Sequence, residues 1–236
     1  MGGFATTHWS LVCAAGDGDS PEAHAALECL CRSYWYPVHA FIRRLGHPPD
    51  DARDLTQEFF ARLLARRGVG VADPARGRFR AFLLASVRHF LSDEWDKNRA
   101  QKRGGGASAI PFDELGTWER FAVVPSGDAP PDVVYERNWA RSVLAQVSRR
   151  LREEYAKAGR IDRFEGLEQF LPDGDGELTY AQLGGRLGLT EAAIRSEVHR
   201  MRERFRELLR REIAHTVSTP EEIDGEIHHL MRVVIG

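Results

Sequence analysis

Apolar residues recur at every third or fourth position along most of this chain, and that spacing constrains its fold more than any other feature. Side chains with this spacing share one face of an α-helix, whereas a half-buried strand would alternate strictly. Three such stripes lie in the first half of the chain: Leu27, Leu30, Tyr34, Val38, Phe41 and Leu45; Leu55, Phe59, Leu63 and Leu64; and Phe79, Leu83, Val87, Phe90, Leu91 and Trp95. The spacing therefore predicts an all-α fold.

Glycine and proline divide this helical pattern into two small helical domains. A glycine triplet at 104–106 and the prolines at 111, 125, 130 and 131 interrupt it, which is typical of a linker. We expect a first domain over residues 5–103, a linker over 104–132, a second domain over 133–213 and an amphipathic extension over 214–236. The stripes of the second domain are Trp139, Val143, Val147 and Leu151, then Phe164, Leu167, Phe170 and Leu171.

Composition favours a soluble protein of a reducing compartment. Hydrophobic residues make up 42% of the 236 and charged residues 29%, an ordinary globular balance. No apolar run is long enough to cross a membrane, and the first residues lack the basic start and apolar core of a signal peptide. Three cysteines are too few for a disulfide framework. We therefore expect a cytoplasmic protein with no membrane partner.

Charge is balanced overall but segregated locally. The chain holds 33 basic and 35 acidic residues, so any nucleic-acid contact must come from local patches. Residues 78–103 carry a local excess of four positive charges, and residues 195–212 an excess of three.

The segment from about 178 to 209 has the requirements of a helix-turn-helix. Gly188 stands where the tight turn needs a positive φ, and Gly184 where the two helices come closest. Thr190 can cap the second helix, whose inner seam would be Ile194, Val198, Met201, Phe205 and Leu208.

The outward face of that second helix suits the major groove of DNA. Its amino-terminal residues would read base edges, and Arg200, Arg202 and Arg204 would hold phosphates. The alternative is a helical hairpin with a solvated, arginine-rich face. We favour DNA binding, through Thr190, Glu191, Ala192, Arg195, Ser196, His199, Arg200 and Arg202.

Four segments, in order, resemble those of bacterial RNA polymerase sigma factors. Residues 52–60 resemble the core-polymerase-binding helix, and residues 36–44 the helix before it. Residues 79–93 resemble the promoter-melting helix, followed by a basic run that ends at Lys102 and Arg103. Residues 194–202 are similar to the reader of the start-distal promoter element. The two-domain layout resembles the extracytoplasmic-function (ECF) class.

This resemblance implies a promoter-specificity subunit rather than an enzyme. Its partners would be core RNA polymerase, double-stranded promoter DNA and the melted single strand, with an anti-sigma factor as a further candidate. The polymerase contacts would be Arg53, Asp54, Gln57, Glu58 and Arg62. The start-proximal element would be bound by Arg80, Arg88, His89, Ser92, Lys97, Asn98, Arg99, Lys102 and Arg103.

Some residues have two interpretations. We expect Trp95 to pack rather than to stack on bases, and His89 suits either role. Glu197 is acidic at a position where the family usually has a basic residue. Its side chain could accept a hydrogen bond from cytosine, repel phosphate or pair with Arg200 or Arg202. The region 160–171 replaces the short segment that the family usually has before its helix-turn-helix.

The sequence predicts that the carboxyl-terminal extension forms a capped amphipathic helix. Thr219, Pro220 and Glu222 combine an N-cap, a first-turn proline and a capping-box acid. The apolar stripe comprises Ile223, Ile227, Leu230, Met231 and Val234. We expect the helix to pack on the second domain; the alternative is a regulatory or partner-binding helix.

No catalytic, cofactor or metal site is expected. Asp173, Asp175 and Glu177 lack the closing glutamate of a calcium loop, and Cys29 and Cys31 lack the spacing of a zinc site. No phosphate-binding glycine loop or nucleophile motif occurs. The competing hypotheses are a stand-alone helix-turn-helix regulator whose first helices dimerise, and a helical interaction module that does not bind DNA.

Overall fold

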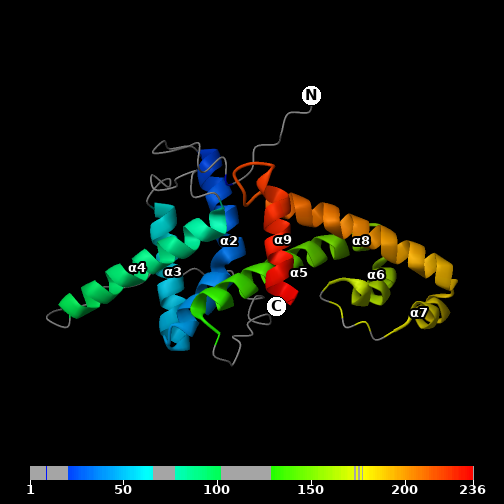
Figure 1. Cartoon of the computed structure of the whole chain (residues 1–236), viewed down its shortest axis with the longest axis horizontal. Helices are drawn as coiled ribbons and strands as arrows, with labels where there is room; N and C mark the ends of the chain where they lie inside the picture. Colours follow the sequence, from blue (N-terminus) through cyan, green and yellow to red (C-terminus); the bar gives the residue numbers. More distant parts are fainter. Residues whose placement is uncertain are drawn as a thin grey trace. The chain divides into compact units, whose positions relative to one another are not determined.

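The computed structural model describes residues 9, 21–65, 78–101, 129–172, 174, 176 and 178–235. These residues form helices without any strand, as Figure 1 shows, so the all-α prediction is confirmed. The elements are α2 (Pro21–Arg44), α3 (Pro49–Ala65), α4 (Phe79–Gln101), α5 (Pro131–Lys157), α6 (Ile161–Leu167), the 3-10 turn η3 (Glu168–Phe170), α7 (Tyr180–Leu187), α8 (Glu191–Ala214) and α9 (Glu222–Ile235).

The chain divides into two compact units. The first comprises Met1–Ser142 together with Ala214–Gly236, and the second comprises Val143–Ile213. The first unit therefore contains α2, α3, α4, the start of α5 and α9. The domain limits expected from the sequence, at 103 and 133, stay predictions because residues 102–128 lie outside the described part of the chain.

Aromatic side chains hold the first unit together. The ring of Phe79, the first residue of α4, lies 4.9 Å from that of Tyr34 in α2 and 5.1 Å from that of Trp9. Phe59 of α3 lies 5.6 Å from Phe90 of α4. All five rings are buried, and four of them, all but Trp9, belong to the helical stripes predicted from the sequence.

Helix α9 packs in the first unit, so the expectation that it packs on the second domain is wrong. Ile223 and Leu230 of its predicted apolar stripe are buried, but so is Glu226, which binds arginines of the first unit. The helix begins at Glu222, whose carboxylate accepts hydrogen bonds from the backbone N–H groups of Ser218 (2.9 Å) and Thr219 (3.2 Å). The capping role predicted for Glu222 is confirmed.

The second unit contains the predicted helix-turn-helix, α7 and α8. Gly188 ends α7 with φ at +66°, and a Cβ on Gly184 would lie 2.6 Å from the carbonyl oxygen of Leu189. Thr190 Oγ1 accepts a hydrogen bond from the N–H of Ala193 at 3.2 Å, as an N-cap does. The predicted inner seam is buried at all of its positions: Ile194, Val198, Met201, Phe205 and Leu208. These features confirm the motif.

Helix α7 has a cap that the sequence analysis did not identify. Thr179 accepts a hydrogen bond from the N–H of Gln182, and the Gln182 side chain accepts one from the N–H of Thr179 at 2.9 Å. This reciprocal pair fixes where the first helix of the motif begins.

Candidate nucleic-acid and polymerase interfaces

The outward face of α8 is exposed where the sequence places its DNA contacts. The residues of this face, and the cap before it, are Thr190, Glu191, Ala192, Arg195, Ser196, His199, Arg200 and Arg202, and all are exposed. Arg195 binds Glu191 at 2.7 Å, and its guanidinium lies 5.8 Å from the centre of the Tyr180 ring. Both contacts are at the surface, where ion pairs are weak and easily exchanged for a ligand.

Two further arginines of α8 differ in how firmly they are held. Arg202 is exposed and donates one hydrogen bond, at 3.0 Å, to the carbonyl oxygen of Phe170. Arg204 is half-buried and donates two to the Glu154 carboxylate, at 2.6 and 2.8 Å. Hydrogen bonding to Arg204 lowers the pKa of Glu154, and the same bonds raise the pKa of Arg204. Arg202 is therefore the better placed phosphate contact, and Arg204 holds α8 on α5.

Glu197 does not face outward with the arginines. Its side chain is 13% exposed and accepts a hydrogen bond from Arg163 of α6, with Arg200 a further 3.6 Å away. The sequence analysis left three roles for Glu197, and of these the structure contains the ion pair with an arginine. The sequence analysis did not anticipate Arg163 of α6 as a partner of Glu197.

The exposed surface of α4 includes a tryptophan. Trp95 is 64% exposed, so the expectation that it packs in the core is wrong. His89 and Ser92, also exposed, precede it on the same helix at spacings of three residues. Residues at such spacings are neighbours on a helix surface. An aromatic ring with polar neighbours is a surface on which an unstacked base can lie.

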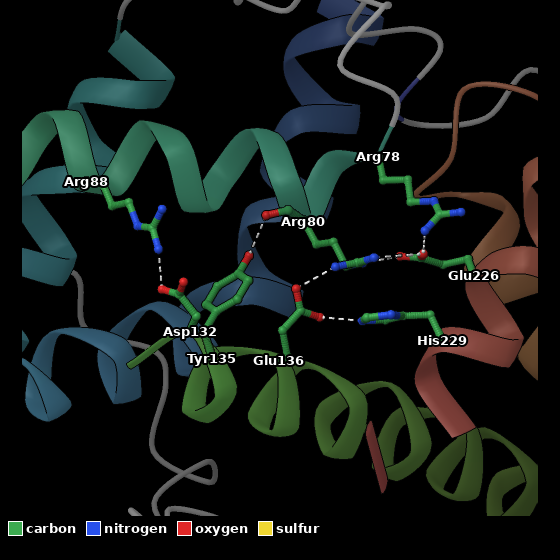
Figure 2. Close-up of polar contacts among 8 residues, drawn as sticks. All are labelled: Arg78, Arg80, Arg88, Asp132, Tyr135, Glu136, Glu226 and His229. Atoms are coloured by element: carbon green, nitrogen blue, oxygen red, sulfur yellow. Dashed lines mark hydrogen bonds and ion pairs between the residues drawn. The ribbon is translucent and has the colours of Figure 1, made fainter. Parts of the chain in front are cut away.

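Two predicted DNA contacts on α4 are already paired (Figure 2). Arg80 is buried and is held by Glu226 of α9 and Glu136 of α5. Burial lowers the pKa of Arg80, but the hydrogen bonds and negative charges of these acids outweigh it, so the net change is upward. Arg88 is exposed and pairs with Asp132 at the start of α5.

The rest of the predicted start-proximal set is only partly described. Lys97, Asn98 and Arg99 lie on the backbone of α4, and their side chains are outside the described part of the chain. Lys102 and Arg103 lie wholly outside the described residues, as do Asp173, Asp175 and Glu177 of the predicted turn.

The predicted polymerase-binding residues form one stretch of α3. Arg53 and Asp54 are exposed, and Gln57 and Glu58 are half-buried. Arg62 binds Glu58 on its own helix and Glu94 of α4 (2.6 Å), and lies 5.0 Å from the centre of the Phe90 ring. Arg62 therefore also joins α3 to α4.

The described residues contain neither a cluster of side chains fit for a metal ion nor a helix long and apolar enough to span a bilayer. Of the two described cysteines, Cys29 is exposed and Cys31 is buried. Burial, with a smaller contribution from Glu28, raises the pKa of the Cys31 thiol.

The acid that sequence reasoning missed is Glu226. It stands three residues after Ile223 and four before Leu230, on the face that the apolar stripe defines. An acid on an apolar face is typical of a buried, paired carboxylate, but the sequence near residue 226 does not identify its partners.

Comparison with known proteins identifies the family. Residues 30–101, from α2 to the end of α4, match the model of Sigma-70 region 2. Residues 30–101 therefore form a segment of the Sigma-70 region 2 type.

Its curated relatives are ECF sigma factors. The chain is 27% identical over 191 residues to "ECF RNA polymerase sigma factor SigE" of Mycolicibacterium smegmatis, covering 80% of this chain and 64% of the relative. It is 26% identical over 199 residues to "ECF RNA polymerase sigma factor SigF" of Caulobacter vibrioides, covering 83% and 89%. The match thus spans less than two thirds of the first relative's length. No solved structure matches the chain. Together the region 2 match and these two relatives support an ECF-class sigma factor.

Proposed function

We propose that this protein binds core RNA polymerase, recognises the start-proximal and start-distal promoter elements, and initiates transcription. The observation that carries the proposal is the 64% exposure of Trp95 on α4, within the segment that matches Sigma-70 region 2. An exposed aromatic ring with polar neighbours on the same helix is a surface on which an unstacked base of melted promoter DNA can lie.

The remaining roles divide between the two units. Exposed Arg53 and Asp54 of α3, with Gln57 and Glu58, supply a polar surface for core polymerase. The outward face of α8, from Thr190 to Arg202, reads the start-distal element, and Arg200 and Arg202 hold phosphates. Arg80 and Arg204 are left out of these surfaces because each is committed to carboxylates of its own unit.

In vitro transcription tests this proposal. Purified protein mixed with core polymerase is expected to co-elute with it and to start transcripts from selected promoters. No co-elution and no promoter-dependent transcript would refute the proposal. Salt-sensitive binding to duplex DNA without those two results would instead support a stand-alone helix-turn-helix regulator.

A further inference from the structure

Three carboxylates from elements distant in the sequence occupy the arginines at and before the start of α4. Glu226 of α9 accepts hydrogen bonds or ion pairs from Arg78 (2.9 Å) and Arg80 (2.6 Å). The other two acids lie on the first turns of α5: Glu136 forms an ion pair with Arg80, and Asp132 forms one with Arg88. Figure 2 shows the three acids aligned along one side of α4. We name Asp132, Glu136 and Glu226 the carboxylate clamp.

The clamp is an unusual way to attach a helix. Glu226 is fully buried, and the Arg80 side chain is 10% exposed. A buried ion pair stabilises a fold no better than apolar residues of the same volume, because both charges lose their hydration. Among the apolar residues of α9, Ile223 and Leu230 are buried, Ile227, Met231 and Val233 are half-buried, and Val234 and Ile235 are exposed. Helix α9 is thus attached by apolar contacts together with ion pairs, and a competing anion could replace the ion pairs.

The competing anion with the right chemistry is phosphate. A guanidinium binds the paired oxygens of a phosphate as it binds those of a carboxylate. Arg80 presents its Nε and Nη2 atoms to the two Glu226 oxygens, at 2.6 and 3.3 Å, which is the geometry that a phosphodiester would also occupy. His229 of α9 adds a contact at 2.9 Å to Glu136, so α9 and α5 hold Arg80 together.

We propose that α9 and the first turns of α5 form an autoinhibitory clamp that keeps the arginines of α4 from nucleic acid until phosphates displace the carboxylates. The inference rests on the proposed function, since it requires that α4 meets DNA. It adds that the free protein binds single strands weakly and that α9 detaches when they bind.

Hydrogen exchange on the wild-type chain tests detachment. The probe is a single-stranded DNA oligonucleotide of mixed sequence, in excess and at low salt. Backbone amides of α9 are expected to lose protection when the oligonucleotide is added, while those of α2 stay protected. Unchanged protection of α9 in the saturated complex would overturn the clamp.

Charge-removing variants test the competition. Asp132→Asn removes the partner of Arg88 at an exposed pair, where the effect on folding is small. Glu226→Gln removes the carboxylate bound to Arg78 and one of the two carboxylates bound to Arg80, which keeps Glu136. Because the arginines contact phosphates in the wild-type complex as well, removing a competing carboxylate should tighten binding to the single strand rather than change the salt slope. The affinity is expected to rise by about fivefold or more in each variant relative to the wild type. Glu221→Gln, an exposed acid next to α9, is the control with the same change of charge.

The outcomes separate the two proposals. If Asp132→Asn and Glu226→Gln bind the oligonucleotide no more tightly than Glu221→Gln, the clamp is refuted, and transcription by core polymerase can still support the proposed function. If none of the variants directs transcription with core polymerase, the proposed function fails whatever the affinities are.

Discussion

Glu197 of α8 accepts a hydrogen bond from Arg163 of α6, and this pair ties α8 to the segment before the helix-turn-helix. The side chain of Glu197 is turned toward α6 and is 13% exposed. Helix α6 (Ile161–Leu167) thus supplies a partner for the acid that the sequence analysis singled out on α8.

Removing this acid should affect stability rather than promoter choice. Glu197→Ala leaves Arg163 without its partner and is expected to lower the free energy of unfolding by about 1 kcal/mol, with unchanged promoter preference. Glu203→Ala, an exposed acid of the same helix, is the control and should change stability by less than about 0.5 kcal/mol. Denaturant unfolding and a comparison of promoters measure both effects. A change of promoter preference with Glu197→Ala would show that the acid reads DNA.

Trp95→Ala is expected to weaken binding to single-stranded promoter DNA by about 1–3 kcal/mol, the usual contribution of one base–aromatic stack. Because the ring is 64% exposed, the thermal midpoint should stay near that of the wild type. Trp95→Phe should restore part of the affinity. Fluorescence titration with an oligonucleotide and open-complex assays provide the measurement. Wild-type affinity in Trp95→Ala would remove Trp95 from the proposed surface.

Two adjacent glycines of α7 should respond in opposite directions to alanine. A Cβ at Gly184 meets the Leu189 carbonyl oxygen at 2.6 Å, so Gly184→Ala is expected to cost about 1–3 kcal/mol of stability and to disturb the turn. A Cβ at Gly185 meets nothing within 4 Å, so Gly185→Ala should stabilise the helix by about 0.5–1 kcal/mol. Denaturant unfolding of the two variants gives the comparison. Equal effects would contradict the close approach at Gly184.

Acid should weaken the first unit through His39. Burial, with Arg43 and Arg53 nearby, lowers the pKa of His39 from 6.5 to about 4, and its ring stacks on Trp35 with centroids 5.1 Å apart. Between those pH values the unfolded chain binds a proton that the folded chain does not, so stability falls as pH drops from 6.5 to 4. The expected slope is about 1 kcal/mol per pH unit.

The variant His39→Phe keeps a ring on Trp35 and removes the titration. For each protein, the unfolding free energy is expressed as the change from its own value at neutral pH. The fall in this quantity between pH 6.5 and 4 should be smaller for His39→Phe than for the wild type. A pH profile identical to that of the wild type would assign the acid sensitivity to other groups.

Arginines at the two ends of the outward face of α8 should differ in their effects. Arg195→Ala, near the amino terminus of the helix, is expected to change which promoter sequences are preferred, by about 1–3 kcal/mol at one base position. Arg202→Ala should weaken all promoters alike and reduce the salt slope by about one. Equal effects of both variants on every promoter would contradict the proposed orientation of α8 in the groove.

The helix-turn-helix was predictable because its signals are local. Gly188 and Thr190 act within a few residues of their own position, and the seam from Ile194 to Leu208 repeats with the helical period. The same holds for Glu222, which caps α9 through the N–H groups just before it.

The misjudged positions depend on contacts between distant residues. Trp95 continues the apolar stripe of α4 but is 64% exposed, and periodicity does not say which positions of a stripe the neighbouring helices cover. Arg80 looked like a surface cation because its partner Glu226 lies 146 residues later in the chain. The place of α9 followed from that same pair, which no local pattern reveals.

The first unit is built from two separate stretches of the chain, Met1–Ser142 and Ala214–Gly236, so the ribosome completes the first stretch before it makes the second. The N–H of Phe79 at the start of α4 donates to the carbonyl oxygen of Thr216, and that of Trp9 donates to His215. Residues 214–236 are therefore structural parts of a unit whose other members are made first. On the ribosome, α4 is exposed without the carboxylate of Glu226 until residue 226 has emerged. A truncated product would present uncovered arginines, so premature termination should yield a molecule with altered nucleic-acid binding rather than merely a shorter copy.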